Sequence, residues 1–221
     1  MSALDTPIRR RRKDARPQEL LDAALELFVE KGFAAARADE VAQRAGVSKG
    51  TLYLYYPSKE ELLKAVIREH LSTRIAAGAA LADQHRGSTS ELLREVFGRW
   101  WQDVLDSPTS GVFKLVITEV RNFPDLAAFY QREVVEPGER LIGRIVQRGI
   151  DDGEFEPLDV ACVVHSLMLP MVMCCLHKHS LGACAPHDDH FDPAVFIRSH
   201  IDLVLRGLAR QTGRPVGRGA R

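Results

Sequence analysis

The sequence predicts an all-α fold, with three short helices at the N-terminus and a larger helical domain after them. Apolar residues recur every three or four positions along most of the chain, as on one face of an amphipathic helix. No segment shows a convincing alternation of apolar and polar residues, the pattern of a half-buried strand. Several of the periodic segments end at glycine or proline, which commonly terminate helices.

The first three predicted helices occupy the first 55 residues. The first runs from Pro17 to Lys31 and stops at Gly32. A second fits Asp39–Ala45, and a tight turn at Gly46 and Val47 leads to a third over Ser48–Tyr55. Ser48 is a natural N-cap, so we expect its hydroxyl to begin the third helix.

The remaining segments are also predicted to be helical. Ser58 and Glu61 form a capping box that opens a long helix from about Lys59. A later helix is capped by Ser90, and further segments run over about 111–121, 122–136, 139–152, 158–177 and 193–208. We divide the chain into a basic, flexible arm (1–16), an N-terminal domain (17–64), a second domain (65–210) and a flexible tail (211–221).

Charge and apolar content limit where the protein acts. The chain has 30 Lys and Arg against 30 Asp and Glu, so the molecule as a whole is not attracted to a polyanion. Residues 1–16 are basic. This segment is either a run of solvated charges or an arm that contacts DNA, and the sequence favours neither interpretation. We expect no membrane association, because no apolar run approaches ~20 residues, and no signal peptide, so the protein should be cytoplasmic.

The order of the first three helices is that of a helix-turn-helix. Leu52 and Tyr56 are four residues apart and are expected to face the core. The outward-facing residues of the third helix are then Lys49, Gly50, Thr51, Tyr53 and Tyr55. Lys49 could donate to guanine, Gly50 would let the backbone approach DNA, and the hydroxyls suit phosphate oxygens. Lys59 would bring a cation and free backbone N–H groups to a phosphate.

Two motifs carry a family resemblance: Gly46-Val47-Ser48-Lys49-Gly50-Thr51-Leu52-Tyr53 and Tyr55-Tyr56-Pro57-Ser58-Lys59-Glu60. With these motifs, residues 17–64 resemble the DNA-binding domain of the tetracycline-repressor (TetR) family. The resemblance implies about nine helices, a homodimer built on the last two, and a C-terminal pocket for a small-molecule effector. Residues 113–129 are also similar to a subgroup of multidrug-efflux (AcrR-type) regulators.

One position departs from the family pattern. The family usually has Thr or Ser pairs just before its second helix, whereas this chain has Ala36-Arg37-Ala38. Arg37 either replaces the hydroxyl with a charge-assisted phosphate contact or is simply solvated.

We expect the second domain to carry both the dimer interface and the effector-binding site. Leu158–Leu176 and the apolar face of the last helix exceed what one subunit needs to bury, so we expect them to pair across a two-fold axis. That face consists of Val195, Phe196, Ile201, Leu203, Val204 and Leu208. Such a dimer predicts a near-palindromic double-stranded DNA site. The candidate effector-binding residues are Trp100, Trp101, Phe113, Glu119, Phe123, Phe129 and His165, although the same residue types also build an ordinary helical core.

Two further constellations offer other functions. Cys174, His177, Cys184 and His187 have spacing acceptable for zinc, but buried thiols in an apolar helix are commonly small core groups. Cys162 and His165 could pair as nucleophile and base, yet nothing supplies an orienting group. We therefore predict no cofactor and no enzyme, but a DNA-binding repressor released by a small apolar effector. A metal- or thiol-responsive regulator is the alternative, and a helical enzyme the remote one.

Overall fold

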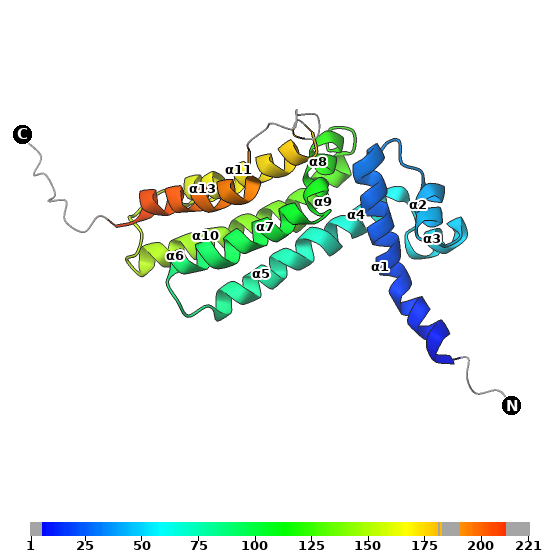
Figure 1. Ribbon diagram of the computed structural model, residues 1–221, viewed down its shortest axis with the longest axis horizontal. Helices are drawn as coiled ribbons and strands as arrows, with labels where there is room; N and C mark the ends of the chain where they lie inside the picture. The colour runs from blue at the N-terminus through cyan, green and yellow to red at the C-terminus, as the bar shows by residue number, and fades with distance from the viewer. Residues whose placement is uncertain (1–5, 181, 183–190, 211–221) are drawn as a thin grey trace, which may run out of the picture.

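The computed structural model describes residues 6–180, 182 and 191–210, and these residues are all-α, as predicted. Helices α1 (Thr6–Lys31), α2 (Ala38–Arg44) and α3 (Lys49–Tyr55) form an N-terminal unit at one end of an elongated molecule (Figure 1). The larger domain contains, in chain order, α4 (Lys59–Ile67), η1 (Arg68–Ser72), α5 (Thr73–Gln84), α6 (Thr89–Leu92), η2 (Leu93–Phe97), α7 (Gly98–Asp106), α8 (Ser110–Glu119), α9 (Pro124–Tyr130), η3 (Gln131–Val135), α10 (Glu136–Asp151), α11 (Val160–Lys178) and α13 (Pro193–Leu208).

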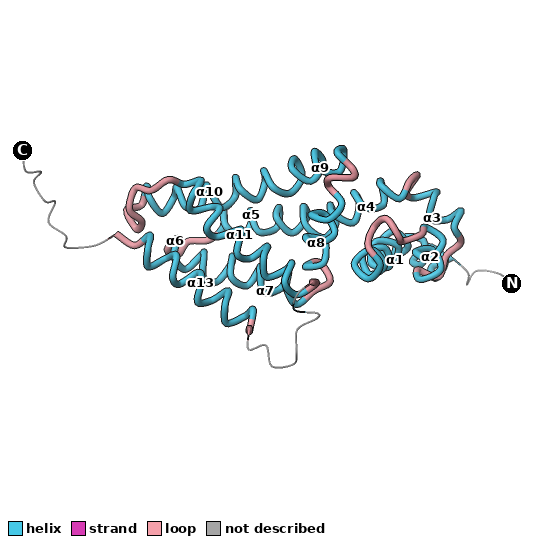
Figure 2. Tube along the Cα trace, turned by 90° about the horizontal axis from the view of Figure 1, so that it is seen from above, coloured by secondary structure: helices cyan, strands magenta, loops and turns pink. Residues whose placement is uncertain are grey.

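The segments η1, η2 and η3 are π-helical and join the α-helices on either side of them. When each joined run is taken as one helix, the described residues contain nine helices, in agreement with the expected number. Their only β structure is an isolated bridge between Phe155 and Ala209. Seen from above, α5 and α11 lie in the middle of the larger domain, with α9 and α10 on one side and α7 and α13 on the other (Figure 2).

The first helix begins earlier than predicted. It starts at Thr6 rather than Pro17, so the boundary placed at residue 16 does not coincide with a helix start. Residues 9–16 consist mostly of Arg, Lys and Ala, which have high helix propensity, and the helix continues through Pro17. The predicted contact of this basic segment with DNA stays a prediction, and the predicted tail at 211–221 lies outside the described residues.

The helix expected to be interrupted at Pro137 and Gly138 instead continues from α9 through η3 into α10. Proline lacks the N–H that would bond the carbonyl four residues earlier, here Glu133. The Ser72 hydroxyl in η1 donates to that carbonyl at 3.1 Å. A side chain from the neighbouring helix therefore supplies the missing hydrogen bond, which the sequence pattern could not reveal.

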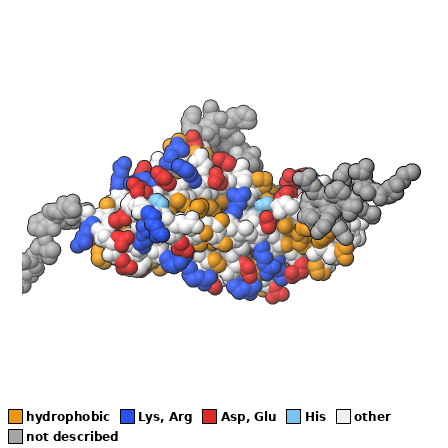
Figure 3. All heavy atoms as spheres, turned by 90° about the horizontal axis from the view of Figure 1, so that it is seen from below, with side chains coloured by type: hydrophobic (Ala, Val, Ile, Leu, Met, Phe, Trp, Pro, Cys, Tyr) orange, Lys and Arg blue, Asp and Glu red, His pale blue; other side chains and the backbone are white. Residues whose placement is uncertain are grey.

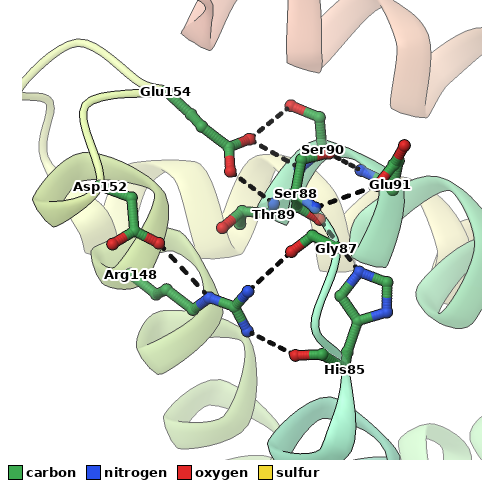
Figure 4. Close-up of polar contacts among 9 residues, drawn as sticks. All are labelled: His85, Gly87, Ser88, Thr89, Ser90, Glu91, Arg148, Asp152 and Glu154. Atoms are coloured by element: carbon green, nitrogen blue, oxygen red, sulfur yellow. Dashed lines mark hydrogen bonds and ion pairs between the residues drawn. The ribbon is translucent and has the colours of Figure 1, made fainter.

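The end of the larger domain farthest from α1–α3 is held by a polar cluster (Figure 4). Ser88, rather than the predicted Ser90, is the N-cap of α6, and it forms a capping box with Glu91. Glu154 accepts hydrogen bonds from the Thr89 N–H at 2.7 Å and the Ser90 N–H at 3.1 Å. Arg148 donates to the Gly87 carbonyl at 2.8 Å. The loop before α6 is thus tied to α10 and to the turn after it.

Helix α11 is more apolar than the sequence expectation allowed. It is 19 residues long, and by length and composition alone it could cross a membrane, so the expectation that no run approaches this length is wrong. In the fold it packs against α8, α10 and α13, and a core helix of a helical domain meets the same criterion.

Candidate nucleic-acid interface and internal cavity

The turn between α2 and α3 holds the third helix in a defined orientation. Gly46 has φ +66°, a backbone conformation that side chains with a Cβ rarely adopt. The Val47 N–H donates to the Ala42 carbonyl at 2.9 Å. The Ser48 hydroxyl accepts the Thr51 N–H at 3.1 Å, which confirms Ser48 as the N-cap of α3. Leu52 is fully buried and fixes the inner face of this helix.

The outer face of α3 is exposed and carries mixed chemistry. Lys49 and Gly50 are exposed, and the side chain of Tyr53 is 41% exposed. The Lys49 ammonium lies 5.9 Å from the centroid of the Tyr53 ring. Leu54 is 81% exposed, the highest value among the large apolar side chains found exposed in the described residues. Leu54 was not among the residues predicted to face DNA, although its place between Tyr53 and Tyr55, both expected to face outward, was a signal.

Two residues expected to face outward are only partly exposed. Thr51 is half-buried, and its hydroxyl lies 2.9 Å from the Ser48 hydroxyl. Tyr55 is half-buried and packs against the core. Of the five predicted outward residues, Lys49, Gly50 and Tyr53 therefore present the most open surface to a partner.

Arg37 is the N-cap of α2 but does not cap the helix with its side chain, since a guanidinium has no acceptor. Its backbone N–H donates to Glu40 at 3.1 Å, and its guanidinium makes two hydrogen bonds to Asp39, at 3.1 and 3.0 Å. Hydrogen bonding from this guanidinium lowers the pKa of Asp39. The Arg37 side chain is exposed yet already paired, so any phosphate would compete with Asp39 for it.

The position of Lys59 corrects the prediction that its ammonium is free for phosphate. The Nζ atom donates to the carbonyls of Phe33, Ala34 and Ala36, at 2.8, 3.2 and 3.1 Å. It also lies 4.5 Å from the centroid of the Phe33 ring. An ammonium has three protons, and these three bonds use all of them. Lys59 thus closes the loop after α1, and only the backbone N–H groups at the start of α4 keep the predicted role.

The larger domain contains a cavity of about 550 Å³, a size typical of small-molecule sites. Its wall is mainly apolar and comes from η1, α5, α6, η2, α7, α8, α9, η3, α10 and α11. Four of the predicted effector-binding residues line it: Trp100, Trp101, Phe113 and His165. The rings of Trp100 and Trp101 meet edge to face, with centroids 4.9 Å apart.

The ionisable residues of the cavity wall are Glu95, Arg99, Asp103, Glu139 and His165. The His165 Nε2 lies 3.4 Å from the Glu139 Oε1. Glu95, Arg99 and Asp103 are exposed, so these residues stand at the rim of the cavity rather than in its interior. The view from below shows side chains of both charges over the surface, with apolar groups between them (Figure 3).

Three predicted effector-binding residues do not line this cavity. Glu119 is buried, and its Oε2 has no hydrogen-bond partner among the described residues. Phe123 packs edge to face against Phe33, at 5.1 Å between centroids, in a smaller pocket of about 200 Å³. Phe129 is buried beneath Arg68, whose guanidinium carbon lies 4.7 Å from the ring centroid. These side chains are of the types that line a pocket, but their positions in the fold place them outside the cavity.

The cysteine and histidine residues give no metal site within the described part of the chain. No group of three or more possible ligands comes together there, while Cys184 and His187 lie outside the described residues. Burial raises the pKa of Cys174, and it raises that of Cys175 to about 12. Both are therefore protonated at neutral pH, which disfavours a role as reactive thiolates. His165, suggested as a base for Cys162, is instead paired with Glu139.

Two family models match the chain. Residues 20–66 match the model of bacterial regulatory proteins of the tetR family, and residues 83–183 match a tetracyclin repressor-like C-terminal domain. The HTH-type transcriptional regulator YfiR of Bacillus subtilis is 30% identical over 161 residues, covering 72% of this chain and 77% of YfiR.

Solved structures share the fold. The fatty acid degradation regulator FadR from Bacillus halodurans is 20% identical with a TM-score of 0.74, covering 88% of this chain and 97% of FadR. FadR from Bacillus subtilis in complex with stearoyl-CoA is also 20% identical, with a TM-score of 0.67 and coverage of 86% and 98%. The AcrR-type subgroup stays a prediction, while the family is clear from both domains. The chain belongs to the TetR family of bacterial transcriptional regulators, which bind DNA through an N-terminal helix-turn-helix.

Proposed function

We propose that this regulator is a cytoplasmic repressor that binds a near-palindromic operator as a homodimer and leaves it when a small aliphatic molecule fills the cavity. The observation that carries the proposal is the cavity of about 550 Å³, whose wall includes residues of the helical run that starts beside α3. An effector placed there contacts the helix that connects the two units.

The exposed face of α3 supports base reading in the major groove. Lys49 is suited to the guanine O6 and N7 acceptors, and the Leu54 side chain to a thymine methyl group. Gly50 is not required by the fold, because an added Cβ would meet only the Ser48 Oγ at 3.8 Å. Its lack of a side chain is better explained by close approach to DNA.

Exposed apolar side chains on and beside the last two described helices support the homodimer. They are Leu158, Leu169, Met173, Val195 and Leu203. Ile201 and Leu208, which the sequence analysis assigned to the interface, are instead buried within the subunit. A four-helix bundle of α11 and α13 with their two-fold mates would cover the exposed set.

The dimer is tested by sedimentation. A Leu203→Glu variant places a charge in the proposed interface at a position where the side chain is 67% exposed in the subunit. It should dissociate at concentrations where the wild type is dimeric, and a wild type that is monomeric at micromolar concentration would refute the assembly. Gln84→Glu adds the same single negative charge at an exposed site on α5, rather than on the last two described helices, and serves as the control.

The class of effector follows from the wall of the cavity and from the neighbours. Apolar side chains make up most of the lining, so burial of methylene groups would supply most of the affinity, about 0.8 kcal/mol for each. One structural neighbour is a fatty acid degradation regulator, and another was solved with stearoyl-CoA. Both observations support an effector with an aliphatic chain.

The test combines operator selection with ligand titration. Random duplexes would be selected, and aliphatic compounds then titrated into the complex while DNA anisotropy is recorded. Coupling is reciprocal, so a ligand that lowers DNA affinity must itself bind more weakly to the DNA complex by the same factor.

A matched pair of variants locates the effector site. Ile117 lines the cavity and is 48% exposed, so Ile117→Asp adds a charge there without burying it deeply. Thr118→Asp makes a comparable change at the next, exposed residue, which does not line the cavity. Only Ile117→Asp should weaken ligand binding. Ligand binding that leaves DNA affinity unchanged would contradict the proposed release.

A further inference from the structure

The hydroxyl of Tyr130 is a polar group placed inside the mainly apolar cavity. Tyr130 is the last residue of α9 and lines the cavity. Burial, with a smaller contribution from Cys175, raises the pKa of Tyr130 far above its usual value. The hydroxyl therefore keeps its proton under all physiological conditions and remains a hydrogen-bond donor.

The described part of the chain makes no use of this hydroxyl. Within the described residues it makes no hydrogen bond, and its pKa shift includes no hydrogen-bond contribution. The buried polar atoms that lack a hydrogen-bond partner do not include it, so this hydroxyl is accessible to solvent. Tyr130 is half-buried and lines the cavity, so we assign its accessible hydroxyl to the cavity. Buried polar groups normally have a partner, so a ligand atom is the natural candidate for this one.

The rim restricts the charge of that ligand. Three carboxylates, from Glu95, Asp103 and Glu139, stand against the Arg99 guanidinium and His165. Glu139 lies 3.4 Å from His165, so His165 already has a carboxylate partner within the protein. A head group with several negative charges would therefore meet a net negative rim, whereas an uncharged group would meet no repulsion.

We propose that the effector is an uncharged aliphatic molecule with a carbonyl oxygen that accepts a hydrogen bond from the Tyr130 hydroxyl. This inference rests on the proposed function, because it takes the cavity as the effector site. It separates this regulator from the neighbour solved with stearoyl-CoA, whose ligand carries a phosphorylated head group.

The chain provides its own reporter for the test. Its only two tryptophans, Trp100 and Trp101, both line the cavity, so tryptophan emission reports its occupancy. Methyl decanoate, undecane and decanoyl-CoA would each be titrated into the full-length protein. These probes present a chain with a carbonyl, a chain without one, and a chain with a polyanionic head. Methyl decanoate should bind most tightly.

Tyr130→Phe removes only the hydroxyl. It should weaken methyl decanoate about fivefold, the equivalent of about 1 kcal/mol for one hydrogen bond, and leave undecane unchanged. Tyr56→Phe makes the same deletion in the N-terminal unit, where the Tyr56 hydroxyl lies 3.5 Å from the Pro17 carbonyl, and should change neither affinity.

The outcomes separate this inference from the function on which it rests. Equal weakening of both uncharged probes by Tyr130→Phe, or no weakening of either, overturns the hydrogen bond. Tighter binding of decanoyl-CoA than of methyl decanoate overturns the conclusion about charge. In each of these cases the aliphatic effector itself still stands. If no probe changes the emission or releases DNA, the proposed function fails as well.

Discussion

Replacing Lys59 by methionine separates a structural lysine from a DNA-binding lysine. The ammonium of Lys59 donates to three backbone carbonyls in the loop after α1 and lies over the Phe33 ring. Methionine keeps most of the aliphatic stem but removes the charge and all three donors. The three carbonyls would then depend on water, and two of the three hydrogen bonds are partly buried.

The expected loss of stability follows from these contacts. A hydrogen bond to a charged group is worth about 1.5–3 kcal/mol when a partner is removed from a buried site. The site is only partly buried, so water can replace part of the loss. The cation–π contact adds about 0.5–1 kcal/mol. We therefore expect Lys59→Met to lower the free energy of unfolding by about 2–4 kcal/mol.

Urea unfolding measures this loss, and the salt dependence of operator binding tests the alternative role. Each phosphate contact that is lost reduces the slope of log K against log salt by about 0.9. Lys49→Met is the matched control, since Lys49 is exposed on α3 and should affect DNA binding without changing stability. Lys59→Met should leave the slope unchanged. A variant within about 0.5 kcal/mol of wild type, but with a flatter slope, would refute the internal role of Lys59.

Three further predictions use the same measurements. Gly50→Ala should bind the operator more weakly without any loss of stability, because the fold leaves room for the added methyl group; unaltered affinity would argue against close DNA approach. Ser72→Ala should cost about 1–2 kcal/mol by leaving the Glu133 carbonyl unpaired, and an unchanged urea midpoint would disprove that. Burial lowers the pKa of His70, so stability should fall as pH drops below about 6.5, where the unfolded chain binds a proton first. His70→Gln should reduce this loss between pH 6.5 and 5, and an equally steep decline in the variant would exclude His70 as its source.

Local rules accounted for most helix starts. Ser48, Ser58 and Asp192 each accept backbone N–H groups at the positions expected of N-caps. These signals are short in sequence and need no tertiary contact. The start of α6 was misplaced by two residues because Ser88 and Ser90 are both plausible caps, and Glu91 pairs with the first of them.

The roles of individual side chains were less predictable. Lys59 has the position of a phosphate ligand in the sequence, but it folds back 23–26 residues to the loop after α1. Phe123 and Phe129 have the composition of a pocket wall, yet they pack between the two units and beneath Arg68. Composition does not show which residues of a helix face a cavity. For the same reason Tyr130, which lies in the cavity wall, was not predicted.

The contacts between the two units explain how a distant cavity can act on DNA. The helical run α4–η1–α5 places Leu71 and Ile75 in the cavity wall, and it begins at Lys59, which is bonded to the loop that leads to α2. A second contact joins α8 to α1, where Gly111 packs so closely against Val29 that an added Cβ would overlap it. Because the N-terminal unit is held both by α4 and by α8, it must follow a displacement of either helix. In a dimer the separation of the two α3 helices must match one turn of DNA or a multiple of it, so even a small rotation of each unit reduces affinity. Under the proposed function, the packing that fills the space between the cavity and α1 converts occupancy of the cavity into a change in operator binding.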